Sequence, residues 1–392
     1  MKTITKTSKE QIRILQVVGW MDRGGLETWL MHVLRNIDRE RFHIDFLVET
    51  TESCAYDSEV RALGSNIIPC LHPSKPLLYA RNFKRFYQEY GPYDIIHSHI
   101  HNYSGYILKL GKQVGIPIRI AHSHNDTSSL KYDAGLKRRL YLALTEYWIK
   151  RYATAGLACS SKAAAALYGT NWQNDSRFST YYCSIDFSKW KLETNSVAIR
   201  ADLGIPKDAF VIGHVGRFAE QKNHSFLIDI AAEVIKHKPK TKLLLVGGGS
   251  LRPEIEKKVR DKNLTECVIF AGLRSDVPQI MRGAMDIFLF PSLYEGLPLT
   301  LVEAQASALP CIFSDVITEE VDIVKPFMHR VSLSTSAKHW ADMLLSVSQN
   351  KSTITQKQSL NMIEESLFCI EKGVQELQKI YAQSNSSLLI KT

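Results

Sequence analysis

The sequence contains no run of about eighteen uncharged apolar residues, so we expect no membrane-spanning helix. Its seven cysteines are scattered along the chain, and none has the C-x-x-C spacing of a metal or redox motif. Several lie in apolar runs, which predicts reduced thiols in the core of a cytosolic chain. The basic first residues lead into an apolar run that carries Arg13 and ends at Asp22 and Arg23. We expect a buried first strand there and no signal peptide.

The amino-acid composition is neither strongly polar nor strongly biased toward a few residue types. The 392 residues are 45% hydrophobic and 23% charged, which excludes wholesale disorder and a fibrous repeat and leaves room for two globular domains. The formal net charge of +9 suits an anionic partner such as a nucleotide, a nucleic acid or an acidic lipid. Charge alone does not choose among these three.

Short apolar runs, each followed by a helical pattern, recur along the chain. Such runs predict strands buried on both faces of a parallel sheet, and hence an α/β chain with two doubly wound, Rossmann-like domains. We expect an N-terminal domain over 1–192, a C-terminal domain over 203–375, and a closing helix whose 376–392 part packs back on the first domain. The predicted strands are 12–18, 44–48, 94–98, 117–122 and 154–159 in the first domain, and 210–216, 242–248, 267–272, 286–291 and 310–315 in the second.

In such sheets, ligands bind beyond the carboxyl ends of the strands. Gly24 and Gly25 follow the first strand and open a helix, so they allow either a close approach to a phosphate or simply a tight turn. A dinucleotide fingerprint is absent, because Arg252 stands where the second glycine cluster, Gly247–Gly249, would need a further glycine. Nicotinamide chemistry is therefore disfavoured.

Histidines follow two strands of the first domain. His97, His99 and His101 alternate, so an extended chain would point all three to one side, as metal ligands or as polar groups of a cleft. No carboxylate or cysteine stands at ligand spacing beside them, and we expect no metal. His122 and His124 close the next strand and are expected in a cleft, because a buried histidine needs a partner for each ring nitrogen.

The second domain carries a stronger pattern. Arg217 and Lys222 lie between a strand end and a helix start, where they would clamp a diphosphate or form a solvated basic loop. Pro298 at a first helical position would leave the N–H groups of Leu299 and Thr300 free for phosphate oxygens. Two carboxylates beside that helix, Glu295 and Glu303, suit sugar hydroxyls as hydrogen-bond acceptors.

These motifs together resemble the retaining nucleotide-sugar glycosyltransferases of family 4. The resemblance rests on EGLPLTLVEA, with Glu295 and Glu303 eight residues apart, and on GRFAEQKN, LLLVGGGSLR and FAGLRSDVPQIM, in order and with spacing intact from about residue 12 to 316. The AHSHN stretch is most similar to bacterial exopolysaccharide and capsule enzymes.

The resemblance implies a GT-B fold, in which two Rossmann-like domains face a central cleft and the second domain holds the donor. Arg217 and Lys222 would neutralise the diphosphate, Glu303 would bind the ribose, and Glu295 would contact the transferred sugar. His122 would touch the donor sugar, with His124 as second choice. The implied catalytic residues are His122, Arg217, Lys222 and Glu295, and the implied donor-binding residues are Gly24, Gly25, Arg217, Lys222, Arg274, Glu295, Gly296, Leu299, Thr300 and Glu303.

The expected reaction moves a hexose-type sugar from a nucleotide sugar, with UDP favoured, to a hydroxyl of a lipid-linked polysaccharide precursor. The resemblance favours front-face attack with retention, and the cations make a metal or other cofactor unnecessary. A sugar-nucleotide epimerase and a non-catalytic nucleotide-sugar-binding subunit are the alternatives. Nucleic acid is not an expected partner, since no recognition motif is present.

Residues 130–153 mix charges with apolar side chains at helical spacing. Lys131, Lys137, Arg138, Arg139, Lys150 and Arg151 oppose only Asp133 and Glu146. The segment is either an ordinary packed helix with a solvated basic face or a peripheral contact with anionic lipid on the inner face of the cell membrane.

Overall fold

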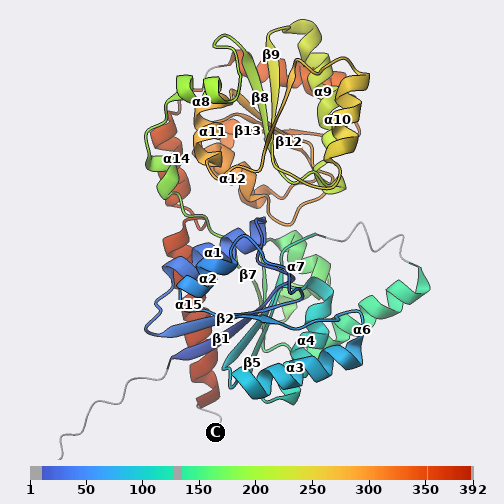
Figure 1. Ribbon diagram of the computed structural model, residues 1–392, viewed down its shortest axis with the longest axis vertical. Coiled ribbons are helices and arrows are strands. Elements are labelled where there is room, and N and C mark those ends of the chain that lie inside the picture. The colour runs from blue at the N-terminus through green and yellow to red at the C-terminus, as the bar shows by residue number, and fades with distance from the viewer. Residues whose placement is uncertain (1–10, 127–134, 351, 390–392) are drawn as a thin grey trace, which may run out of the picture. The chain divides into compact units, whose positions relative to one another are not determined.

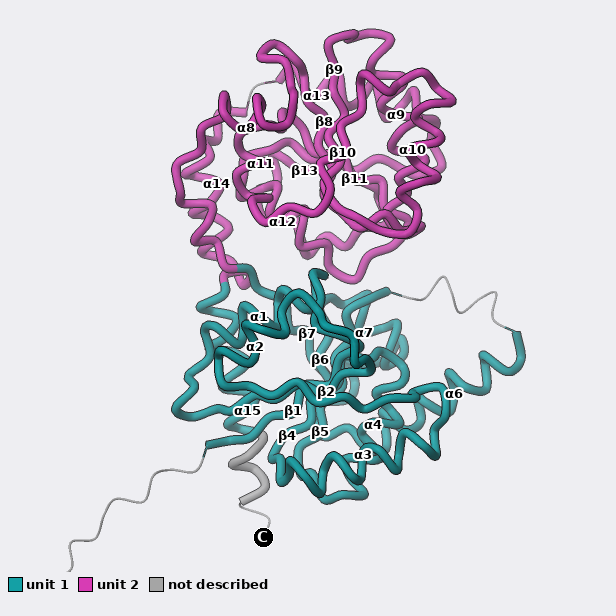
Figure 2. Tube along the Cα trace, in the orientation of Figure 1, with its two compact units in different colours: residues 1–185, 370–392 teal, residues 186–369 magenta. Residues whose placement is uncertain are grey.

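The computed structural model describes residues 11–126, 135–350 and 352–389. The chain forms two compact units (Figure 2): unit 1 comprises residues 1–185 and 370–392, and unit 2 comprises residues 186–369. None of the described helices is both long and apolar enough to cross a membrane.

Unit 1 is a seven-stranded sheet in which every pairing is parallel, in the order β3-β2-β1-β4-β5-β6-β7. Helices α1 and α15 lie on one side of the sheet, and α3 and α4 lie on the other (Figure 1). The strands are β1 (Ile12–Val17), β2 (Phe42–Val48), β3 (Ile67–Pro69), β4 (Ile95–Ser98), β5 (Ile118–Ser123), β6 (Ala155–Ala158) and β7 (Phe178–Thr180). The α-helices are α1 (Gly25–Asn36), α2 (Asp57–Ala62), α3 (Pro76–Tyr90), α4 (Ser104–Gln113), α6 (Leu136–Tyr152), α7 (Ser161–Tyr168) and α15 (Ile370–Leu389).

Unit 2 is a six-stranded parallel sheet in the order β10-β9-β8-β11-β12-β13. Its strands are β8 (Phe210–Val215), β9 (Thr241–Val246), β10 (Val268–Gly272), β11 (Ile287–Phe290), β12 (Cys311–Ser314) and β13 (Met328–Val331). Its α-helices are α8 (Ser196–Asp202), α9 (His224–His237), α10 (Arg252–Asp261), α11 (Val277–Ala284), α12 (Leu299–Ala306), α13 (Ala337–Gln349) and α14 (Gln356–Glu364).

The predicted α/β class and doubly wound topology are confirmed, and all ten predicted apolar runs contain strands. Sequence analysis missed β3, β7 and β13, which span three or four residues each and lie at sheet edges. An edge strand has a neighbour on one side only, so it needs no continuous apolar run.

Burial on both faces explains the central strands. Leu243, Leu244 and Leu245 of β9 are all fully buried although successive side chains point to opposite faces. Each such leucine contributes about 1.5 to 3 kcal/mol through removal of apolar surface from water. Five of the seven cysteines are buried, as expected for core residues.

The last helix belongs to unit 1. Val374, Leu377 and Tyr381 of α15 are buried, and the Tyr181 hydroxyl donates to the Gly373 carbonyl over 2.7 Å. This contact brings the C-terminal part of the chain onto the sheet formed by the first 185 residues.

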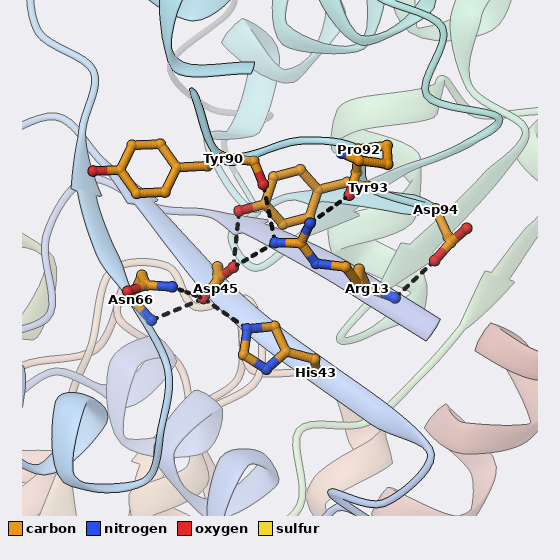
Figure 3. A network of polar contacts seen from close by, with 8 residues as sticks. All are labelled: Arg13, His43, Asp45, Asn66, Tyr90, Pro92, Tyr93 and Asp94. Carbon is orange, nitrogen blue, oxygen red and sulfur yellow. Dashed lines mark hydrogen bonds and ion pairs between the residues drawn. The ribbon is translucent and has the colours of Figure 1, made fainter. Parts of the chain in front are cut away.

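Buried Asp45 of β2 anchors a polar network near the residues that precede β3 and β4 (Figure 3). The Tyr93 hydroxyl donates to Asp45 Oδ2 over 2.8 Å, the Asn66 backbone N–H donates to Oδ1 over 2.8 Å, and His43 lies 3.1 Å from Oδ1. Burial would raise the pKa of Asp45, but the hydrogen bonds from these partners outweigh it and lower the pKa to about 2.

Strand order reverses beside β1 in unit 1 and beside β8 in unit 2. In open parallel sheets, a crevice forms at such a point, outside the carboxyl ends of the strands. The residues that follow β1 and β4, and those that follow β8 and β11, are therefore where each unit can hold a ligand.

Candidate active site

The loops after β8 and β11 meet at the switch point of unit 2. The Leu293 backbone N–H donates to the Gln221 carbonyl over 2.8 Å. Lys222 Nζ lies 2.6 Å from Glu295 Oε1, and Gln221 Nε2 donates to Glu295 Oε2 over 2.9 Å. Both oxygens of Glu295 are therefore held by protein donors.

Arg217 is exposed, and its guanidinium makes no hydrogen bond or ion pair within the part of the chain that the structure describes. Lys222 also lies over the Phe290 ring, 4.7 Å from its centre. Of the two predicted clamp residues, Arg217 is thus available to an anion, whereas Lys222 is shared with Glu295.

The glycine cluster after β9 packs against the loop after β8. The Phe218 backbone N–H donates to the Gly248 carbonyl over 2.8 Å, and Gly247 has a φ of +141°. A Cβ on Gly247 would lie 2.1 Å from the Gly216 carbonyl oxygen. Glycine is required here for close contact between the two loops, which positions the backbone beside Arg217.

Helix α12 begins at Leu299, and Pro298 is its N-cap. The expectation that Pro298 occupies the first helical position is wrong by one residue, because its ψ of 90° is not helical. Among the described residues, the N–H groups of Leu299 and Thr300 have no backbone partner, and the buried Thr300 hydroxyl has none either. The start of α12 can therefore offer donors to an anionic or polar ligand.

Glu303 lies within α12 and is partly exposed. No described protein group donates a hydrogen bond to its carboxylate, and burial among its neighbours raises its pKa to about 7. It differs in this from Glu295, whose carboxylate is fully engaged.

Arg274 is not free to meet a ligand with its side chain. Its guanidinium forms two 2.8 Å bonds to Asp276 and a 3.0 Å bond to Asp202. Leu273 beside it is 67% exposed, and a Cβ on Gly248 would be 3.4 Å from the Leu273 side chain. Any contact to a base at this strand end would use the backbone and Leu273.

In unit 1, Gly24 is the N-cap of α1. A Cβ on Gly24 would lie 2.2 Å from Glu27 Oε2, whereas a Cβ on Gly25 would meet nothing within 4 Å. The Glu27 carboxylate is the end of a flexible side chain and could move aside, so this contact alone does not require glycine at position 24, and the space beside Gly25 is open.

The structure brings four histidines of unit 1 together, but not the predicted trio. His101 lies in the 3₁₀ turn His101–Tyr103, because the chain leaves the extended conformation at Ile100. His122 takes its place beside His97 and His99, with His97 Nε2 3.2 Å from His122 Nδ1. His122 is fully buried, whereas His124 is partly exposed.

Hydrogen bonds engage almost every nitrogen of this cluster. His99 Nδ1 lies 2.8 Å from His124 Nε2, and His99 Nε2 lies 2.8 Å from Gln16 Oε1. His97 Nδ1 lies 2.8 Å from the Tyr381 hydroxyl, which accepts from Gln16 Nε2 over 3.0 Å. The Trp29 ring packs against the cluster, with its centre 5.4 Å from that of His122 in an edge-to-face arrangement.

Two sets of three could offer metal ligands within 4.8 Å of one another: His97, His99 and His122, or His122, His124 and Cys183. Cys183 is not at ligand spacing in the sequence, but the fold brings its Sγ to 3.6 Å from His124 Nδ1. A tetrahedral zinc site would need ligand atoms roughly 3.4 Å apart, from bonds of about 2.1 Å. The ring nitrogens instead pair with one another and with Gln16 and Tyr381.

Sequence reasoning missed Gln16, Cys183, Gln221 and Tyr381 because all four lie far along the chain from the residues they contact. One signal was available, since buried imidazoles need partners for both nitrogens. It could not say which residues supply them.

Solved structures share this architecture. A structure of HepE from Anabaena with UDP and glucose matches with a TM-score of 0.78 at 18% identity, covering 95% of this chain and 100% of that one. WaaG, a glycosyltransferase of lipopolysaccharide biosynthesis, matches with a TM-score of 0.67 over 95% of this chain and 98% of its own. The fold is that of a GT-B glycosyltransferase.

Sequence relatives specify the family. Residues 23–189 match Glycosyltransferase Family 4, and residues 196–366 match Glycosyl transferases group 1. EpsF of Bacillus subtilis, which carries a glycosyltransferase name, is 38% identical over 86% of this chain and 88% of its own. CapH of Staphylococcus aureus, named for capsular polysaccharide biosynthesis, is 24% identical over 94% of this chain and 98% of its own. The chain belongs to the family 4 glycosyltransferases and is an enzyme of polysaccharide biosynthesis.

Proposed function

We propose that the protein transfers a hexose-type sugar, with retention of configuration, from a UDP-sugar to a hydroxyl of a lipid-linked polysaccharide precursor. The observation that carries the donor assignment is Glu303. Its carboxylate has no protein donor in the described residues, and it stands in the helix whose first N–H groups are also unpaired. A nucleoside diphosphate offers ribose hydroxyls to the Glu303 carboxylate and phosphate oxygens to the first N–H groups of α12.

The remaining roles follow from charge and availability. Arg217, the α12 N–H groups and Lys222 stabilise the diphosphate, and Glu295 contacts the transferred sugar. Lys222 exchanges its bond to Glu295 for a phosphate oxygen, which leaves a Glu295 oxygen for a sugar hydroxyl. In unit 1, His122 stays the first candidate for the imidazole that meets the sugar and His124 the second: His122 is buried but its Nε2 has no hydrogen-bond partner among the described residues, whereas His124 is partly exposed with both nitrogens hydrogen-bonded.

The proposed chemistry is front-face transfer. The bond from the anomeric carbon to the diphosphate oxygen breaks, and the acceptor oxygen bonds on the same face while its proton passes to the departing diphosphate. The fixed positive groups stabilise the leaving charge, so neither a protein nucleophile nor a metal ion is needed. In the proposed complex Glu295 still accepts from Gln221 and from a sugar hydroxyl, which makes it poorly suited to be a nucleophile.

The acceptor and membrane assignments rest on a relative and on one helix. An Escherichia coli relative, 27% identical over 57% of this chain and 58% of its own, is named a UDP-Gal:α-D-GlcNAc-diphosphoundecaprenol α-1,3-galactosyltransferase. In α6, a row of side chains at helical spacing is exposed, with Leu136 at 75%, Leu140 at 63%, Leu144 at 46% and Tyr147 at 59%. Lys137, Arg138 and Arg139 beside this row suit anionic lipid. Residues 130–134 of the predicted segment lie outside the described residues.

Titration of the purified protein with UDP, GDP and ADP tests the donor assignment. We expect UDP to bind most tightly and transfer to an acceptor hydroxyl to give the α-linked product from an α-linked donor. Formation of an epimer from donor alone would instead indicate an epimerase. Binding without turnover on any polyprenyl-linked acceptor would indicate a non-catalytic subunit.

A further inference from the structure

Hydrogen bonds connect the four histidines of unit 1 into two branches that meet at Gln16. One branch runs from Gln16 through Tyr381 and His97 to His122, and the other runs from Gln16 through His99 and His124 to Cys183. A neutral imidazole has one donor and one acceptor nitrogen, so the direction of one bond sets the direction of the next. The whole cluster therefore has two self-consistent proton arrangements, related by reversal of the Gln16 amide.

The first arrangement has Gln16 Nε2 donating to Tyr381. The Tyr381 hydroxyl then donates to His97 Nδ1, and His97 Nε2–H donates to His122 Nδ1. On the other branch, Gln16 Oε1 accepts from His99 Nε2–H. His99 Nδ1 then accepts from His124 Nε2–H, and His124 Nδ1 accepts from the Cys183 thiol. All four imidazoles carry their proton on Nε2.

The second arrangement reverses every bond. All four imidazoles would carry the proton on Nδ1, His122 Nε2 would be a bare acceptor, and the Cys183 sulfur would accept from His124. Both arrangements satisfy the interior of the network equally. The orientation of the Gln16 amide decides between them.

The orientation of the Gln16 amide favours the first arrangement. Its Nε2 donates to the Tyr381 hydroxyl, and its Oε1, which can only accept, lies 2.8 Å from His99 Nε2, so His99 carries its proton on Nε2. The far end of this branch is compatible with that direction, because burial raises the pKa of Cys183 and the thiol keeps a proton to donate.

The surroundings of the cluster also disfavour a positive charge on any of the four imidazoles. Burial is the main cause that lowers the pKa of all four imidazoles. Repulsion from neighbouring histidines lowers it further, including repulsion from His101 in the case of His124. The pKa values of His97 and His124 are about 3. The groups packed around the cluster are Trp29 of α1, Tyr381 of α15, Tyr181 and Cys183. Within the described residues, no carboxylate is among the groups that act on these four imidazoles.

We propose that Gln16 and Tyr381 are positioning residues that hold all four histidines uncharged with the proton on Nε2, so that the imidazole cluster meets the substrate as an oriented, neutral surface and not as an acid or base. The assignment of the proton positions stands on the hydrogen-bond network alone. Only its effect on catalysis rests on the proposed glycosyl transfer.

The ¹H–¹⁵N spectrum of the full chain labelled in histidine tests the proton positions directly. Single His→Gln variants at 97, 99, 122 and 124 assign the signals. We expect all four to be neutral Nε2–H forms and to stay so from pH 5.5 to 8. A proton on Nδ1 at any of them, an imidazolium in this range, or one tightly bound zinc ion in protein purified without chelator would overturn the proposal.

Tyr381→Phe and Gln16→Met test the positioning role, and Tyr181→Phe is the matched control. Both tyrosine variants remove one buried hydroxyl that ties α15 to unit 1, but the Tyr181 hydroxyl bonds a backbone carbonyl and not an imidazole. We expect Tyr381→Phe to split the His97 and His122 signals into both proton forms, Gln16→Met to do so at all four histidines, and Tyr181→Phe to leave them unchanged.

In the transfer reaction, kcat should fall roughly tenfold in the first two variants, as for loss of one hydrogen bond, and stay within about twofold in the control. The donor KM and the affinity for free UDP should not change, because the nucleotide groups lie in unit 2. Equal loss of kcat in both tyrosine variants, or no spectral change in Tyr381→Phe, contradicts the proposal. If the wild-type protein transfers no sugar, the proposed function fails while the spectra still decide the proton positions.

Discussion

Lys222 and Glu295 form an ion pair in which Nζ and Oε1 are 2.6 Å apart and the two side chains are only 17% and 8% exposed. The residue predicted to bind phosphate and the residue predicted to bind the sugar thus bind each other in the free protein. In the proposed function, a diphosphate that takes Lys222 would release Glu295 for the sugar, and this would couple recognition of the two halves of a nucleotide-sugar.

Glu295→Gln should therefore lower kcat by about 10- to 150-fold, as expected for one charge-assisted hydrogen bond of about 1.5 to 3 kcal/mol. The affinity for free UDP should stay within about threefold, less than the loss of such a bond, because UDP has no sugar to contact Glu295. Calorimetric titration and steady-state kinetics measure the two effects. The control is Glu220→Gln, which changes an exposed carboxylate in the turn that carries Lys222 and should change neither quantity. A large loss of UDP affinity with unchanged kcat would show that the roles of Glu295 and Glu303 are exchanged.

Glu303→Gln should weaken UDP binding by about 10- to 150-fold, since the ribose loses its charged acceptor. The pKa near 7 adds a pH dependence. The carboxylate is the stronger acceptor, so wild-type affinity should fall as the pH drops from 8 to 6, on top of any change due to the nucleotide phosphate itself. The Glu303→Gln variant shows only the pH dependence that comes from the nucleotide phosphate. Identical pH profiles for wild type and variant would exclude Glu303 as the titrating group.

Transfer should not depend on a divalent cation. Arg217, Lys222 and the α12 N–H groups supply the positive charge that Mg²⁺ supplies elsewhere. Activity should be unchanged by EDTA after extensive dialysis. Loss of turnover in EDTA that Mg²⁺ or Mn²⁺ restores would contradict this mechanism.

Membrane binding should reside in α6. Lys137, Arg138 and Arg139 changed together to Glu should abolish co-sedimentation with anionic liposomes, and raised salt should weaken it in the wild type. The control is Arg81, Lys84 and Arg85 to Glu on α3, which makes the same charge change in the same unit away from the exposed leucines of α6. Equal loss in both variants would indicate a diffuse charge effect, and no wild-type binding at low salt would reject the surface altogether.

Acid should destabilise unit 1 through Asp45. Its pKa is lowered to about 2 in the folded chain, against about 3.9 for an ordinary aspartate. A carboxyl with a lowered folded pKa stabilises the fold above the unfolded pKa, and that contribution is lost as pH falls through the folded value. Urea unfolding should show about 2 kcal/mol lost between pH 5 and 2, at about 1.4 kcal/mol per pKa unit. Asp45→Asn should be less stable at pH 5 and lose less on acidification; an equal loss in both proteins would assign the effect to other carboxyls.

The local hydrophobic pattern was enough to predict the central strands of both sheets but not the short edge strands. Runs such as Leu243–Leu245 are apolar on both faces wherever a strand lies between two others, so periodicity identifies them. The strand at Ile67–Pro69 has one neighbour and three residues, and no pattern distinguishes it from a loop.

The site divides in the same way. Arg217, Lys222, Glu295 and Glu303 could be named from the sequence because a strand end and a helix start bring them together within short stretches of chain. The hydrogen-bond partners of these side chains could not be predicted. Arg274 binds Asp202 and Gln221 binds Glu295, through contacts between residues 72 and 74 positions apart in the chain.

The sequence by itself determined the parallel α/β architecture, the two-unit organisation and the chemical types at each strand end, because hydrophobic periodicity and helix starts are local properties. Only the tertiary structure decided which of those groups are free. It pairs Lys222 with Glu295, leaves Glu303 without a described partner, and brings Tyr381 of the last helix to His97 of the fourth strand. The physical reason is that hydrogen bonding and burial depend on neighbours in space, and here those neighbours are up to 365 positions apart in the chain, as Gln16 and Tyr381 are.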